Sequence, residues 1–129
     1  MDYTYDSLKP EADLALAELT ALFEIKLSDN PEYLASQIEN IEAHHDRIST
    51  LLTYAEEVLV KAKDFNLPER ERKFNEFDKK IILGAKTAKE ETMKKMLERK
   101  LDSIETRIQT GQSLLSYHRE SAKLSGRQA

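Results

Sequence analysis

The chain has no cysteine and no tryptophan, and it has only three glycines and three prolines among 129 residues. Without cysteine it can form neither a disulfide bond nor a thiolate metal site. Three glycines are too few for the glycine-rich loops that cradle phosphates, and no nucleophile–base motif is present. Since helix breakers are so rare, each proline or glycine can be taken as a separate boundary signal.

Long hydrophobic runs are also missing, and no segment approaches the length of a membrane-spanning helix. The first six residues include two aspartates and no basic residue. They show no basic region followed by an apolar one, so no secretory signal is visible. We therefore expect a soluble cytoplasmic protein that has no membrane partner.

Two uninterrupted heptad stripes, one in each half of the chain, are the strongest positive signal. Their apolar positions step by four and three residues throughout, which is typical of helices packed along their length. The first stripe is Leu34, Ile38, Ile41, His45, Ile48, Leu52, Ala55, Leu59 and Ala62, and the second is Leu97, Leu101, Ile104, Ile108, Gly111, Leu115, His118 and Ala122. The sequence predicts one all-α domain, built as an elongated antiparallel helical hairpin or three-helix bundle with coiled-coil-like packing.

Capping signals divide residues 1–129 into segments. Ser7 and Pro10 indicate the start of a first helix, and Asn30 or Asp29 followed by Pro31 indicates the start of a second. The predicted segments are an arm over 1–8 that includes Tyr3 and Tyr5, helices over about 10–27, 31–63 and 68–123, and a frayed tail over 124–129. Gly84 and a slip of the heptad around it predict a possible bend in the long helix.

A turn at residues 64–67 would pair the second and third helices antiparallel, with Leu34 near Leu97. The second helix would then end where the second stripe begins. We expect the first helix to continue in line with the second and to cover residues 105–122. The alternative is a first helix folded back into a compact three-helix bundle.

Gly111 occupies a position in the second stripe, where glycine costs about 1 kcal/mol of helix propensity relative to alanine. It can permit a close helix crossing. We expect it to lie opposite a bulky aromatic side chain such as Phe23, and the alternative is a hinge.

Charge is segregated along the chain. Residues 1–67 carry 5 basic and 14 acidic side chains, whereas residues 68–129 carry 15 basic and 10 acidic ones. We expect the two halves to attract each other within the fold. The alternative is a nucleic-acid contact through the densest basic stretch, whose members are Lys79, Lys80, Lys86, Lys89, Lys94 and Lys95. Acidic residues lie between these lysines, which makes a nucleic-acid partner the weaker hypothesis.

Glu42 and His45 form a Glu-x-x-His step, which in di-iron bundles places two ligands on one helix face. A second such step is missing, because the residue three before His118 is Leu115. We therefore expect His45 and His118 to fill stripe positions and His44 to face outward. A metal-dependent helical enzyme remains a second alternative.

The paired acids Glu39/Glu42 and Asp102/Glu105 have the spacing that magnesium-binding helical pyrophosphohydrolases use. Their positions relative to the stripes are outward or flanking, which is typical of a solvated face. We expect no catalytic residue, no metal and no cofactor.

The first helix is apolar on nearly all sides, which predicts more apolar surface than one chain can cover. The predicted protein interface is Leu14, Leu16, Leu19, Leu22 and Phe23. The functional hypothesis is a non-enzymatic assembly or adaptor protein, of the kind found among small phage and bacterial accessory proteins. It would bind itself, another protein, or both, through helix–helix contacts.

Overall fold

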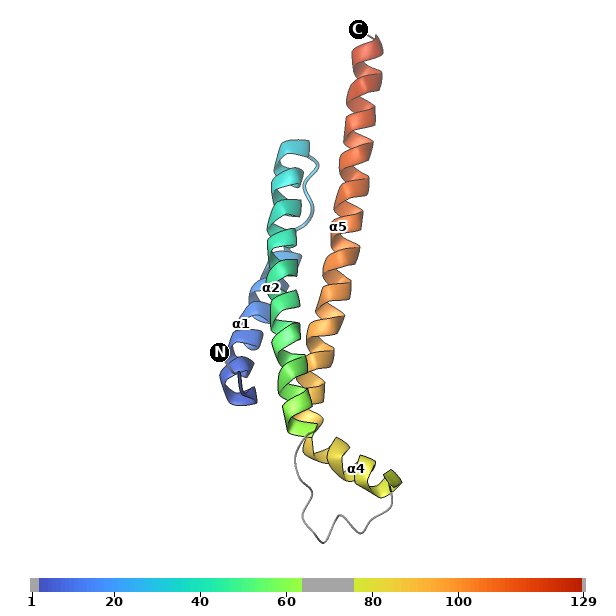
Figure 1. Cartoon of the computed structure of the whole chain (residues 1–129). Coiled ribbons are helices and arrows are strands. Elements are labelled where there is room, and N and C mark those ends of the chain that lie inside the picture. The colour runs from blue at the N-terminus through green and yellow to red at the C-terminus, as the bar shows by residue number, and fades with distance from the viewer. Residues whose placement is uncertain (1–2, 64–75, 129) are drawn as a thin grey trace.

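The computed structural model describes residues 3–63 and 76–128, and every regular element in these ranges is a helix (Figure 1). The helices are α1 (Tyr5–Glu24), α2 (Pro31–Lys63), α4 (Glu76–Lys86) and α5 (Ala88–Gln128). The all-α prediction is confirmed. The predicted turn at 64–67 and the predicted helix start at Pro68 lie outside the described residues. No helix in the described ranges combines the length and the apolar character needed to cross a membrane.

A capping box starts α1 earlier than the sequence prediction. Thr4 is the N-cap: its hydroxyl accepts from the Ser7 amide at 3.2 Å, and the Ser7 hydroxyl accepts from the Thr4 amide at 2.9 Å. The predicted start near Pro10, with Ser7 as N-cap and an arm reaching residue 8, is therefore wrong. The earlier start also brings Leu8 into the core, where it is fully buried.

The predicted bounds of the second helix are confirmed by α2. The Asn30 side-chain oxygen accepts from the amides of Glu32 at 3.0 Å and Tyr33 at 3.3 Å, and Pro31 takes the first helical position. The helix runs from there to Lys63.

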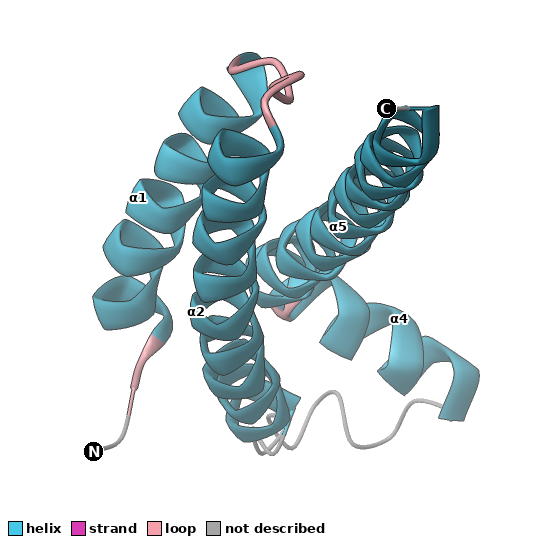
Figure 2. Cartoon of the chain, turned by 90° about the horizontal axis from the view of Figure 1, so that it is seen from above, coloured by secondary structure: helices cyan, strands magenta, loops and turns pink. Residues whose placement is uncertain are grey.

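Three helices form the bundle. In Figures 1 and 2, α1 runs back along α2 in the opposite direction, and α2 runs antiparallel to α5. The Tyr3 and Tyr54 rings lie 4.4 Å apart between centroids, and Arg47 forms an ion pair with Glu18. The predicted in-line first helix is therefore wrong, and the folded-back three-helix alternative is the one that the structure adopts.

The register of α2 against α5 also differs from the prediction. His45 contacts Glu105, and Ile38 lies against Gly111, so the numbers of two facing residues add up to about 150. The predicted pairing of Leu34 with Leu97 corresponds to a sum of 131. The shift arises because α4 turns away from the bundle and contributes no length to the hairpin (Figure 1). As a result, α2 itself covers much of the second stripe.

The change of direction between α4 and α5 occurs at Thr87, three residues after Gly84. Thr87 is buried, and its hydroxyl donates to the Leu83 carbonyl at 2.8 Å. A Cβ on Gly84 would meet nothing within 4 Å, so the bend does not depend on a missing side chain there. The predicted bend exists, but its position is Thr87.

The core combines residues of α1, α2 and α5. Its fully buried large side chains are Leu8, Leu19, Leu34, Ile48, Leu97 and Ile104. All positions of the first stripe are buried or half-buried. Beyond Gly111 no residue of the second stripe is fully buried: Leu115 and His118 are half-buried and Ala122 is exposed. The predicted frayed tail is wrong for residues 124–128, because α5 stays helical to Gln128 and projects beyond the bundle (Figure 1).

Candidate protein interface

The structure divides the predicted interface of the first helix between the core and the surface. Leu16 and Leu19 are buried within the chain, and Leu22 and Phe23 are half-buried against the core. Only Leu14, 55% exposed, is on the surface. The assignment of Leu19 to a subunit interface is therefore wrong, and Leu16 keeps only 8% of its surface exposed: folding back onto α2 and α5 covers most of the face that the sequence left without a partner.

Helices α1 and α5 run parallel, each residue of α1 lying near the residue of α5 whose number is 84 higher. The Lys89 ammonium lies 4.5 Å from the Tyr5 ring centroid, and the Arg107 guanidinium lies 5.4 Å from that of Phe23. Arg107 Nη2 also donates to the carbonyls of Phe23 at 3.3 Å and Ile25 at 2.6 Å. Arg107 thus supplies the positive charge that the last turn of α1 lacks.

A groove follows this pair of helices on the side away from α2. One hollow of about 420 Å³ is lined by Leu16, Ala17, Thr20, Met96, Arg99, Lys100 and Ser103. A second hollow of about 440 Å³ adjoins it at Ser103 and is lined by Phe23, Asp102, Ser103, Thr106, Arg107 and Thr110. The two hollows together form the α1/α5 groove.

Half of the exposed large apolar side chains in the described residues lie on two helical segments, α4 and the C-terminal part of α5. On α4, Phe77 and Ile81 are 71% and 55% exposed, and no residue of this helix is buried. Towards the C-terminal end of α5, which finally projects past α2 (Figure 1), Leu114, Tyr117 and Leu124 are exposed. We call α4 and residues 114–124 of α5 the protruding segments.

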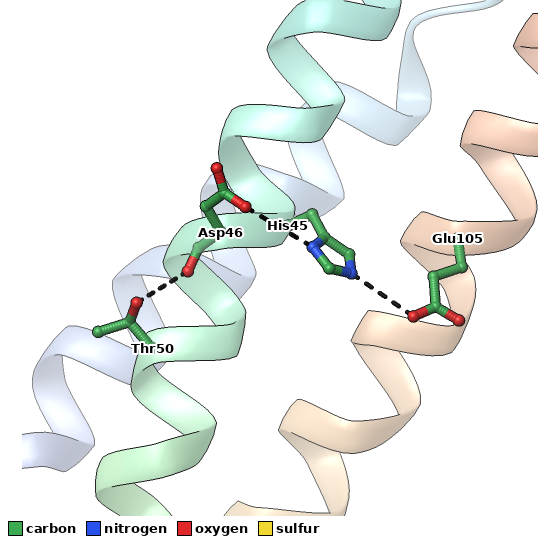
Figure 3. A network of polar contacts seen from close by, with 4 residues as sticks. All are labelled: His45, Asp46, Thr50 and Glu105. Carbon is green, nitrogen blue, oxygen red and sulfur yellow. Dashed lines mark hydrogen bonds and ion pairs between the residues drawn. The ribbon is translucent and has the colours of Figure 1, made fainter.

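His45 lies at the seam between α2 and α5 (Figure 3). Its Nε2 is 3.5 Å from Glu105 Oε1, its Nδ1 is 3.9 Å from Asp46 Oδ1, and the Asp46 carbonyl accepts from the Thr50 hydroxyl at 3.0 Å. His45, Asp46 and Glu105 line a hollow of about 400 Å³ between α2 and α5, and Glu42 lines it too. Nowhere in residues 3–63 and 76–128 do three or more ligating side chains gather to hold a metal ion.

The remaining acids and histidines fall near their predicted faces, apart from His44. Glu39, Glu42, Asp102 and Glu105 are all exposed. His44 is half-buried with its Nδ1 enclosed, so the prediction that it faces outward is wrong. The reason is that α2 contacts two helices rather than one.

The six lysines of the nucleic-acid hypothesis are divided between α4 and α5, which point in different directions (Figure 1). Lys79 lies 3.5 Å from Glu76, Lys94 lies 3.6 Å from Glu98, and Lys89 covers a tyrosine ring. Lys86 also has an interaction of its own, whereas Lys80 and Lys95 are exposed. The structure therefore does not gather the six side chains on one face.

The ion pairs between helices give the expected attraction of the two halves little support. Arg47–Glu18 lies within the acidic half, and Lys63–Glu91, at 3.9 Å, joins a base of the first half to an acid of the second. Neither pair follows the predicted polarity. Arg107 joins α5 to the end of α1 through backbone carbonyls rather than through an acidic side chain.

Gln37 anchors the segment between α1 and α2 although it is polar and 8% exposed. Its side-chain oxygen accepts from the Ser28 amide at 2.8 Å, and its side-chain nitrogen donates to the Lys26 carbonyl at 3.1 Å. Sequence reasoning missed this role. The available signal was a second heptad series on α2, in which Gln37, His44, Leu51 and Val58 recur every seven residues and are all buried or half-buried.

In comparisons with protein-family models, with curated proteins and with solved structures, no match to this chain is found.

Proposed function

We propose that the chain is a non-enzymatic assembly or adaptor protein that acts through helix–helix contacts and associates with itself. The observation that carries the proposal is the set of large apolar side chains on the two protruding segments, outside the three-helix core. Scattered surface apolar residues are ordinary, but apolar residues grouped on a projecting helix mark interaction surfaces.

The end of α5 illustrates the point best. Its heptad stripe runs on to Ala122, whereas α2 begins at Pro31, which in this register faces about residue 119, so the last part of the stripe has no α2 beside it. Tyr117, 66% exposed, and Leu124, 58% exposed, lie beside the uncovered part of the stripe. A helix laid along this segment would bury an apolar face in the way that amphipathic helices fill grooves.

The proposal assigns the bundle a structural role and the protruding segments the contact with a protein partner. That partner is another copy of this chain, another protein, or both. Helix–helix contact needs no cofactor and no metal. We propose the cytoplasm as the place where the protein acts.

Photo-cross-linking tests the protruding segments. A photoreactive residue at Tyr117 or Phe77 should give a discrete adduct in living cells, either with this chain or with one other protein. The same residue at Glu57, which is exposed on α2, is the matched control and should give no discrete adduct. Equal, unspecific labelling at all three positions would contradict the proposal.

A further inference from the structure

We propose that the α1/α5 groove receives helix α1 of a second copy of this chain, in a two-fold dimer. This inference rests on the proposed self-association and adds to it a second contact surface, on the bundle. The surface differs from the protruding segments, which stay open to other contacts in such a dimer.

The groove has an apolar floor and a basic rim. Leu16 and Phe23 contribute apolar surface from α1, and Met96, 43% exposed, contributes it from α5. Arg99 and Lys100 stand on the rim, and neither has an ion-pair partner within residues 3–63 and 76–128. An apolar groove bordered by two unpaired cations is suited to an acidic amphipathic helix.

Helix α1 is such a helix. Residues Tyr5–Glu24 contain five acidic side chains and one basic side chain. On the surface turned away from its own core, Leu14, Ala17 and Ala21 are exposed, and their spacing of three and four residues places them on one face. Small alanines beside one leucine allow close approach to another helix, so this face supplies apolar contact with acidic charge around it.

Two-fold symmetry makes the contact self-consistent. Helix α1 is both a wall of the groove and its occupant, so each α1 would touch α1 and α5 of the other copy. The same surface is then used on both sides, as an isologous interface requires. Thr20 lies on the groove wall of α1, so the two copies of Thr20 should approach each other near the symmetry axis.

Sedimentation equilibrium over a concentration series tests the proposal with Leu14→Gln and Arg99→Glu/Lys100→Glu. Each variant should weaken dimerisation roughly tenfold or more, because every change acts twice in a two-fold interface. Val60→Gln is the matched control, since Val60 is an apolar residue of similar exposure, 59%, on α2. Rising salt should weaken the wild-type dimer but have less effect on the charge-reversed variant.

Oxidative cross-linking adds a direct measure of proximity, because the chain has no cysteine of its own. Thr20→Cys should form a disulfide-linked dimer, and Thr53→Cys, exposed on α2, should not. If the wild type and all the variants associate equally well, or if Thr20→Cys and Thr53→Cys cross-link equally, the inference is overturned and the proposed function still stands. A wild type that is monomeric at every concentration would overturn the inference together with the proposed self-association.

Discussion

At Gly111, α5 lies close against Ile38 of α2, and replacing this glycine with alanine tests the register of the two helices. A Cβ at this position would lie 2.9 Å from Ile38 Cγ1 and 3.1 Å from Ile38 Cδ1. Carbon atoms attract best at about 3.5–4.0 Å, so both contacts would be repulsive. Ile38 is buried, and Cγ1 is not at the free end of the side chain, so relief requires movement of the helix or of a packed rotamer.

Two opposing terms set the expected magnitude. Alanine improves helix propensity by about 1 kcal/mol relative to glycine. Overpacking of a buried contact costs about 1–3 kcal/mol. We therefore expect Gly111→Ala to lower the free energy of unfolding by about 1 kcal/mol.

Gly84→Ala is the matched control, because a Cβ there meets nothing within 4 Å. This substitution should not lower the free energy of unfolding, and it should raise it by up to about 1 kcal/mol if α4 unfolds together with the bundle. Ile38→Val removes the Cδ1 contact and should reduce the penalty of Gly111→Ala in a double-mutant cycle. Urea unfolding followed by circular dichroism gives all four values. If Gly111→Ala stabilised the protein as much as Gly84→Ala, the close approach of Ile38 would be refuted.

Three further outcomes follow from the polar contacts. Arg107→Met removes the donor to two α1 carbonyls and should cost about 1–2 kcal/mol of unfolding free energy, whereas Arg119→Met, on the exposed side of α5, should cost almost nothing. Gln37→Ala leaves the Ser28 amide and the Lys26 carbonyl without their partner and should speed hydrogen exchange in residues 25–30. The negative charge of Glu11, followed by burial and the neighbouring Tyr54, raises the pKa of Tyr3, so stability should fall as the pH rises above about 10. Glu11→Gln should lower the Tyr3 pKa towards that of an ordinary tyrosine in an ultraviolet titration.

Each of these outcomes has a clear contrary result. Equal losses for Arg107→Met and Arg119→Met would mean that the α1 carbonyls do not depend on α5. Unchanged exchange in residues 25–30 after Gln37→Ala would mean that this segment is held by other contacts. A Tyr3 pKa that does not respond to Glu11→Gln would place the two side chains further apart than the structure does.

Heptad periodicity predicted the parts of the fold that depend on local pattern. The first stripe and most of the second lie where α2 meets α5, and the cap at Asn30 starts α2 at Pro31. These features depend on residues close together in the sequence, so a single sequence is enough to predict them.

The wrong register of α2 against α5 and the wrong placement of α1 have a common cause. Both features depend on tertiary contacts between helices rather than on local sequence pattern. The turn predicted at residues 64–67 suggested pairing about that point, but α4 turns away from the bundle and α5 begins only after Thr87, which shifts the pairing. The second side of α2 was missed because Gln37 and His44 are polar and hide a heptad series that is nevertheless buried or half-buried.

The candidate interface shows the same limit. Sequence pattern identified α1 as unusually apolar, but it could not tell which of its leucines the chain covers for itself. Leu19 and Leu14 have the same chemistry, and only the packing of α1 against α2 and α5 buries the first and exposes the second.

Self-association is the central claim, and light scattering coupled to size exclusion, at two protein concentrations, tests it most directly. The chain has a mass of 14.9 kDa. We predict a measured mass above that value, rising with concentration. A mass of one chain at both concentrations would contradict the account.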